Sequence, residues 1–215
     1  MDQTNLDEIA KALAEGIRES LCSSKPRLFT QLLHLIAKGK PVSLEKIATA
    51  LRISRDETTT ALGLMPSVEF DHEGNIIGSG LTLTPTPHHF HVGDHKLFTW
   101  CALDTLIFPV ILKQSARVES PCPVSPVTVQ LTVTPDGVKD LEPASAVVSI
   151  VIPKASEACC DVRGAFCNQV HFFRSSEEAS VWLKEHPGAI ILTVDEAYQL
   201  GRILIEHLFK DEENE

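Results

Sequence analysis

The chain has 215 residues, of which 43% are apolar and 22% are charged, as expected for a globular protein with a substantial core. Its formal net charge of −10 argues against nucleic-acid binding, because contacts with phosphates require clustered Lys and Arg. No apolar stretch approaches the roughly 20 residues that cross a bilayer, and the polar first turns do not resemble a secretion signal. We therefore expect a cytoplasmic protein without membrane contact. Nothing patterned as a coiled coil indicates an oligomer, so we expect a monomer.

The first part of the chain predicts helices followed by a β-hairpin. Apolar residues recur at helical spacing in three segments, and Ser54 with Glu57 forms a capping box that begins a fourth helix. The three segments are residues 6–17, 27–37 and 44–51. Short strands at residues 68–70 and 76–83 then flank a polar turn. This order predicts a winged-helix-like domain over residues 1–83.

A winged helix suggests DNA binding, but the charges argue otherwise. The candidate recognition helix, residues 54–65, offers Arg55 alone against Asp56 and Glu57. A helix that enters a DNA groove normally presents several contacts to phosphates or bases. We expect a structural role for this domain and no nucleic-acid partner.

After Pro85 and Pro87 the pattern shifts toward strands, with a helix predicted over residues 100–108 that ends before Pro109. The expected strands lie at residues 90–92, 97–98, 127–133, 147–152, 170–173 and 190–194, and further helices at 175–186 and 195–209. Residues 84–215 therefore predict an α+β catalytic domain with a mainly antiparallel sheet and flanking helices.

Six cysteines are dispersed along the chain, and no two have the spacing of a zinc finger. They are Cys22, Cys101, Cys122, Cys159, Cys160 and Cys167. In a reducing compartment such thiols are buried, catalytic or metal-binding rather than paired in disulfides.

Cys101 and Asp104 form the strongest candidate site. On a helix they are three positions apart and share a face. With Thr99 as the N-cap, Cys101 would lie in the first turn, where the helix dipole favours a thiolate that binds soft metals. An inert buried cysteine is the competing interpretation. Asp104, however, lies among apolar residues, where a carboxylate needs a partner, and a raised pKa would suit proton transfer.

Several segments, dispersed and in order, resemble the alkylmercury (organomercurial) lyases over nearly the whole chain. They include GKPVS, EFDHEGNIIGSGLTL, WCALDTLIFP, LTVTPDGV, EPASAVVSIVIP and DVRGAFCNQVHFF. The resemblance implies an N-terminal winged-helix-like domain joined to an α+β catalytic domain. It places the two essential thiols on Cys101 and Cys167 and the catalytic carboxylate on Asp104.

The resemblance also implies the reaction. One thiolate captures the mercury of an organomercurial, and the other thiol or Asp104 passes a proton to carbon while the second sulfur joins the metal. The products are a hydrocarbon and Hg(II), held by Cys101 and Cys167 with Asp104 as a weak oxygen ligand. No organic cofactor is implied. Small external thiols, or handover to a mercuric reductase, would release the Hg(II). The alternative is a protein that binds or carries Hg(II) through the same thiols without breaking bonds.

Other candidates carry less weight. Asn168 stands where some family members have a second cysteine, and the adjacent pair Cys159–Cys160 is either a loop feature or an auxiliary relay. Cys122 is expected to pack in the core, and Cys22 to have no function. The histidines between positions 88 and 95 cross a predicted hairpin, so we do not expect a zinc or nickel site there. Trp100 and Phe166 are expected to wall the pocket, and His171 to be a hydrogen-bonded core or rim residue.

Overall fold

The computed structural model describes residues 3–17, 26–65, 67–158 and 161–209. Within these ranges the first part of the chain forms α1 (Gln3–Ile17), α2 (Pro26–Ile36), α3 (Leu44–Leu51), α4 (Arg55–Gly63), β1 (Glu69–Phe70), β2 (Ile76–Ser79) and β3 (Leu81–Thr82). The predicted helices and hairpin are confirmed. The capping box that begins α4 is reciprocal: the Ser54 amide donates to the Glu57 carboxylate at 2.8 Å, and the Glu57 amide donates to the Ser54 hydroxyl at 3.1 Å.

The second part of the chain alternates strands with short and long helices. It comprises β4 (His88–Val92), β5 (His95–Thr99), α5 (Ala102–Leu112), β6 (Ala116–Pro121), β7 (Thr128–Thr134), β8 (Gly137–Glu142), β9 (Val147–Ile150), α6 (Ala155–Ala158), α7 (Val162–Ala165), the 3-10 turn η1 (Cys167–Gln169), β10 (Phe172–Phe173), α8 (Ser176–Leu183), β11 (Ile190–Thr193) and α9 (Val194–Phe209).

The strands form two antiparallel sheets, which confirms the predicted α+β class. The larger sheet has the order β1-β2-β3-β5-β4-β6-β7-β8, and the smaller has the order β10-β9-β11. A two-residue turn joins β4 to β5, and Gly93 in that turn has a φ of +55°, which glycine adopts without steric cost. Because β3 pairs with β5, the larger sheet includes strands from both sides of the predicted domain boundary at residue 83. The division of the chain into two domains at that residue stays a prediction.

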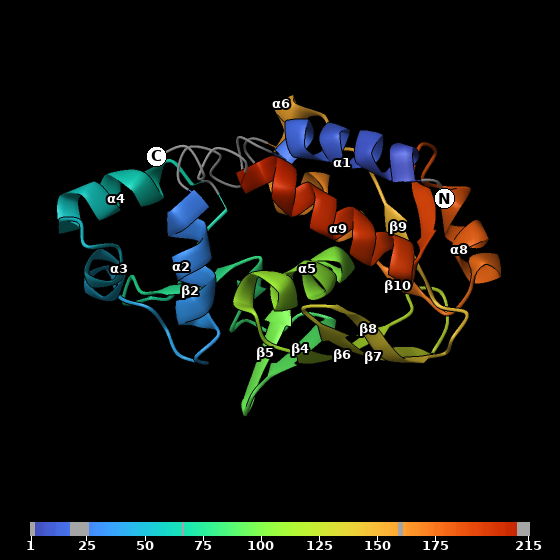
Figure 1. Cartoon of the computed structure of the whole chain (residues 1–215), viewed down its shortest axis with the longest axis horizontal. Coiled ribbons are helices and arrows are strands. Elements are labelled where there is room, and N and C mark those ends of the chain that lie inside the picture. The colour runs from blue at the N-terminus through green and yellow to red at the C-terminus, as the bar shows by residue number, and fades with distance from the viewer. Residues whose placement is uncertain (1–2, 18–25, 66, 159–160, 210–215) are drawn as a thin grey trace.

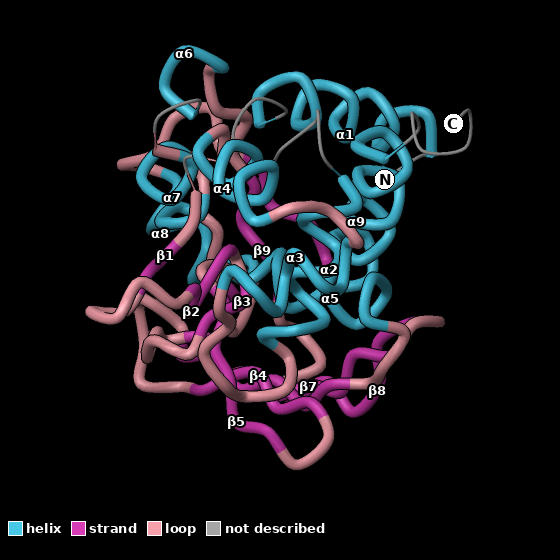
Figure 2. The backbone as a smooth tube through the Cα atoms, turned by 90° about the vertical axis from the view of Figure 1, so that its left-hand side faces the viewer, coloured by secondary structure: helices cyan, strands magenta, loops and turns pink. Residues whose placement is uncertain are grey.

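Helices are stacked above the larger sheet in successive layers. Helix α5 packs on β7, α9 packs on α5, and α1 covers α9, as Figure 1 shows. In the view turned by 90°, strands β4, β5, β7 and β8 lie below α5, whereas β9 lies higher, among the helices (Figure 2). Leu13 of α1, Leu106 of α5 and Leu204 of α9 all lie in one continuous buried cluster. Among the described helices, none combines the length and apolar character that a membrane crossing requires.

The predicted end of the helix before Pro109 is wrong. Helix α5 runs through Pro109 to Leu112. A proline inside a helix removes one backbone hydrogen bond. Phe108 and Leu112, on either side of it, are both buried in the core, and this packing keeps the chain helical past the proline.

Candidate active site

The fold brings together the three residues that the sequence singles out. Cys101 directly precedes α5, Asp104 lies in its first turn, and Cys167 begins η1. One sulfur from each cysteine and one carboxylate oxygen of Asp104 all lie within 4.8 Å of one another. Within the described part of the chain, this is the group of three or more such side chains that could hold a metal ion.

Backbone pairing explains why two cysteines 66 positions apart meet. The Ala102 amide, immediately after Cys101, donates to the carbonyl of Val170 at 3.1 Å, three residues after Cys167. Strand β9 holds the same segment from the other side, since the Ser149 hydroxyl donates to the Gln169 carbonyl at 2.9 Å. The start of α5 is therefore joined to the residue after η1 by a main-chain hydrogen bond, and a side chain of β9 holds η1 itself.

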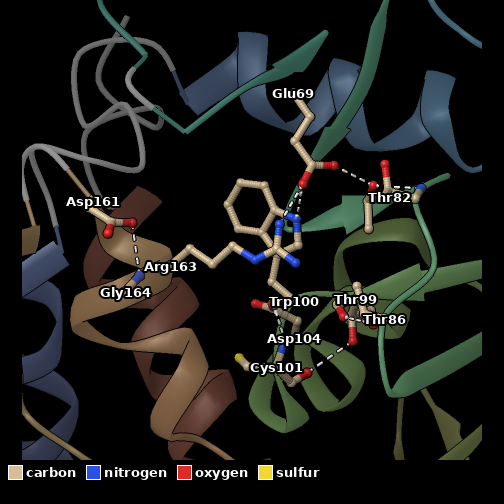
Figure 3. Close-up of polar contacts among 11 residues, drawn as sticks. Glu69, Thr82, Thr86, Thr99, Trp100, Cys101, Asp104, Asp161, Arg163 and Gly164 are labelled. Atoms are coloured by element: carbon tan, nitrogen blue, oxygen red, sulfur yellow. Dashed lines mark hydrogen bonds and ion pairs between the residues drawn. The ribbon is translucent and has the colours of Figure 1, made fainter. Parts of the chain in front are cut away.

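The N-cap of α5 is Cys101 itself, so the prediction of Thr99 as the cap is wrong. Cys101 has an extended backbone, with φ −147° and ψ 172°, and the helix begins at Ala102. The Cys101 amide donates to the Asp104 carboxylate at 3.1 Å, which fixes that side chain beside the thiol. The Thr99 hydroxyl instead donates to the Cys101 carbonyl at 2.9 Å (Figure 3).

Asp104 has the raised pKa that proton transfer needs. The residue keeps some exposed surface, but the protein atoms around its carboxyl group raise the pKa of Asp104 to about 6. The Cys101 thiol and the backbone amides of Cys101 and Trp100 oppose this effect by hydrogen bonding to the ionised form. A carboxyl group that titrates near neutrality can both accept and donate a proton.

The predicted lowering of the Cys101 pKa is wrong. Burial raises the pKa of Cys101 well above its usual value, and the hydrogen bond to Cys167 and the charge of Asp104 act in the same direction. For Cys167, the hydrogen bond from Cys101 lowers the pKa, but burial and the Asp104 charge raise it, and the net pKa is raised. Desolvation therefore outweighs the helix terminus, and both thiols are predominantly protonated in the free protein.

A polar cluster beside the thiols includes two residues that the sequence did not indicate, Glu69 and Arg163. One oxygen of the Glu69 carboxylate accepts from Arg163 at 2.7 Å and from the Trp100 indole at 3.1 Å. The Arg163 guanidinium lies 5.5 Å from the centre of the Trp100 ring (Figure 3). These three residues line a pocket of about 170 Å³. Glu69 and Arg163 both lie in segments that carry the family resemblance, which is the signal that could have marked them.

The two aromatic residues expected to line the pocket, and the one other cysteine within the described residues, are buried. Trp100 and Phe166, each adjacent in sequence to a site cysteine, are both buried. Cys122 is buried, as expected, and its thiol donates to Glu178 at 3.1 Å. The positions of Cys22, Cys159 and Cys160 lie outside the described residues.

Within the described residues, the histidines of the β4–β5 hairpin form no group of three potential metal ligands, although the rings of His89 and His91 lie 6.5 Å apart. His88 is buried and shares a 2.8 Å hydrogen bond with Ser120, whereas His89 and His95 are exposed. Strand β4 places His88 and His89 on opposite faces, which separates potential ligands. His171 is partly buried, and its ring packs edge-on against Trp182, with centroids 5.9 Å apart.

The site consists of a buried dithiol with an adjacent carboxyl group, on an α+β domain that follows a helix-turn-helix in the sequence. A site of this kind suits a soft metal ion. Comparison with known proteins identifies the family. Residues 81–206 match the family model described as alkylmercury lyase, and residues 5–80 match the helix-turn-helix domain of alkylmercury lyase. The chain therefore belongs to the alkylmercury lyase family.

Individual relatives agree with this assignment. The chain is 53% identical over 186 residues to the alkylmercury lyase of Streptomyces lividans, covering 86% of this chain and 85% of that protein. It is 42% identical over 214 residues to the alkylmercury lyase of Pseudomonas putida, covering 99% and 98%. The crystal structure of the mercury-bound form of MerB2 superimposes with a TM-score of 0.73, covering 96% of this chain and 100% of that one at 24% identity, which shows a shared fold.

Proposed function

We propose that this enzyme cleaves the carbon–mercury bond of organomercurials by protonolysis, with Cys101 and Cys167 as mercury ligands and Asp104 as the proton shuttle. The observation that supports this assignment is the convergence of the two sulfurs and the carboxylate within 4.8 Å. Thiolates are the preferred ligands of soft metals, and one mercury atom can contact both sulfurs in a site of this size.

The first step is capture of the organomercurial. One cysteine loses its proton to the Asp104 carboxylate as its sulfur bonds to mercury, and the ligand that the mercury carried leaves. A carboxyl group with a pKa of about 6 suits this role, because at neutral pH it is mostly ionised and able to accept a proton.

The second step breaks the carbon–mercury bond. Asp104, protonated in the first step, gives that proton to the carbon, so that the two electrons of the carbon–mercury bond form the new carbon–hydrogen bond. The remaining cysteine bonds to mercury and passes its own proton to Asp104. The hydrocarbon leaves, and Hg(II) stays between two sulfurs. The second sulfur increases electron density on mercury, which makes the carbon easier to protonate.

Completion of the cycle requires other thiols. Hg(II) bound by two sulfurs leaves by exchange with small external thiols, or by transfer to a mercuric reductase as the acceptor. The protein's own side chains supply every proton and sulfur of the cleavage step, so we propose that no organic cofactor takes part. We further propose that the enzyme acts as a cytoplasmic monomer.

The test is hydrocarbon release. The protein is incubated with phenylmercury and excess thiol, and benzene is assayed in the headspace. Benzene above the level of the protein-free control is expected, and its absence would reject the proposal. Asp104→Ala separates a lyase from a mercury carrier. The ligand that leaves mercury can take the proton of the capturing cysteine in this variant, so mercury capture should persist while benzene release falls sharply. Equal losses of capture and release would contradict the shuttle.

A further inference from the structure

The carboxylate of Glu69 contacts one residue adjacent to Cys101 and one residue in the segment that leads to Cys167. Trp100 immediately precedes Cys101, and Arg163 precedes Cys167 by four residues. A single oxygen, Oε1 of Glu69, accepts from the Trp100 indole at 3.1 Å and from the Arg163 guanidinium at 2.7 Å. Glu69 itself comes from β1, the first strand of the wing hairpin.

The surroundings of Glu69 hold its carboxylate in one orientation. The second oxygen, Oε2, accepts from the Thr82 hydroxyl at 2.5 Å. Gly78 lies opposite Glu69 in the neighbouring strand, and a Cβ atom there would collide with Oε2. The carboxylate thus occupies space that any residue larger than glycine would fill.

The pair formed by Glu69 and Arg163 differs from an ordinary surface ion pair. The Glu69 side chain is only 21% exposed and the Arg163 side chain 40% exposed. The guanidinium also lies over the Trp100 ring, 5.5 Å from its centroid, in the geometry of a cation–π contact. Shielded charge-assisted bonds of this kind fix geometry better than exposed ion pairs, which contribute little.

We propose that Glu69 is a positioning residue that ties the segment carrying Cys101 to the segment carrying Cys167, so that both sulfurs reach one mercury atom. This inference rests on the proposed function and extends it, because it gives a residue of the wing hairpin a part in the reaction. Figure 3 shows the arrangement, with Trp100 and Arg163 between Glu69 above and Cys101 with Asp104 below. Without Glu69, Arg163 of α7 and Trp100, just before α5, lose the carboxylate that both contact; this contact is called the anchor below.

The expected consequence is a loss of turnover with little loss of substrate binding. The first thiol captures mercury alone, whereas the second must arrive at a set distance. A displacement of about 1 Å can lower a reaction rate roughly a hundredfold. Loss of the anchor should therefore reduce kcat on the order of tenfold to a hundredfold and leave KM nearly unchanged.

The experiment uses full-length protein in which Cys22, Cys122, Cys159 and Cys160 are replaced by serine, so that mercury meets Cys101 and Cys167 alone. Steady-state benzene release from phenylmercury gives kcat and KM. In parallel, X-ray absorption of the protein loaded with one equivalent of mercuric chloride gives the number of sulfur neighbours of Hg(II), independently of turnover.

Five variants test the anchor. Glu69→Ala and Arg163→Ala should each lower kcat at least about tenfold and reduce the sulfur count below two. The double variant should be no worse than the stronger single one, since both act through one contact. Glu69→Gln, which keeps an acceptor oxygen, should lose less. Gly78→Ala should reproduce the loss, because the added Cβ would collide with Oε2 of Glu69 and with the Thr82 side chain that binds it.

The matched control is Glu45→Gln, which breaks the exposed Glu45–Arg55 pair at 3.4 Å between α3 and α4 and should leave kcat unchanged. A folded Glu69→Ala protein with normal kcat and two sulfur neighbours would overturn the inference, as would additive losses in the double variant. If the starting protein releases no benzene, the proposed lyase function fails, and the sulfur count alone then decides the role of Glu69.

Discussion

Replacement of Asp104 by Asn tests whether the site holds a carboxyl group with a raised pKa. Burial raises this pKa from 3.8 to about 6, whereas the unfolded chain keeps the lower value. Between these pH values the folded protein binds more protons than the unfolded protein. The stabilisation from protonated Asp104 is therefore fully present below pH 3.8 and is lost as the pH rises through about 6. At 1.36 kcal/mol for each unit of pKa shift, the loss is about 3 kcal/mol.

The measurement is urea unfolding of the wild-type and Asp104→Asn proteins at several pH values from 4 to 7, under reducing conditions, followed by circular dichroism. Asn does not titrate, so the free energy of unfolding of the wild type relative to the variant should fall by most of that ~3 kcal/mol across this range. Other titrating groups, including His88, are present in both proteins and cancel in the difference. A difference that is constant with pH would refute the assignment of a raised pKa to Asp104.

Three further predictions follow from buried positions. Burial lowers the pKa of His88 to about 3, so below pH 6.5 the stability of the wild type relative to His88→Gln should fall by up to about 1.4 kcal/mol per pH unit; a difference that does not change with pH would contradict this. A Cβ atom at Gly201 of α9 would collide with the side chain of Ile107 in α5, so Gly201→Ala should destabilise by about 1–3 kcal/mol. The control Gly63→Ala has open space and should stabilise by up to ~1 kcal/mol; a similar gain in both would refute the packing argument. Cys101→Ser and Cys167→Ser should each abolish benzene release while circular dichroism stays unchanged, and full activity in either would remove that residue from the mechanism.

Local rules predicted the parts of the fold that depend on neighbouring residues. The capping box of Ser54 and Glu57 begins a helix because both partners are three positions apart, and the Gly93–Asp94 turn closes a hairpin between alternating apolar residues. Such features involve few degrees of freedom. Their prediction holds unless tertiary packing overrides the local rule, as it does at Pro109 inside α5.

The candidate site was only partly accessible to the same reasoning. Residue types and spacing favoured Cys101 and Asp104, but the meeting with Cys167 depends on main-chain pairing near Val170 that no local pattern encodes. The position of Cys101 at a helix terminus predicted a lowered pKa, whereas burial raises the pKa of this thiol. Glu69 resembles a solvated residue at the edge of a hairpin, because its partners Trp100 and Arg163 lie 31 and 94 positions away.

The larger sheet has a consequence for how the molecule comes apart. Strand β3 of the wing hairpin is hydrogen-bonded to β5, and β5 leads directly into the residues before Cys101. Separating the helix-turn-helix domain from the remainder would therefore break the hydrogen bonds between β3 and β5 inside the larger sheet, rather than bend a flexible linker. Heat or denaturant should therefore melt both halves in one cooperative event, with lyase activity disappearing in step with the loss of secondary structure.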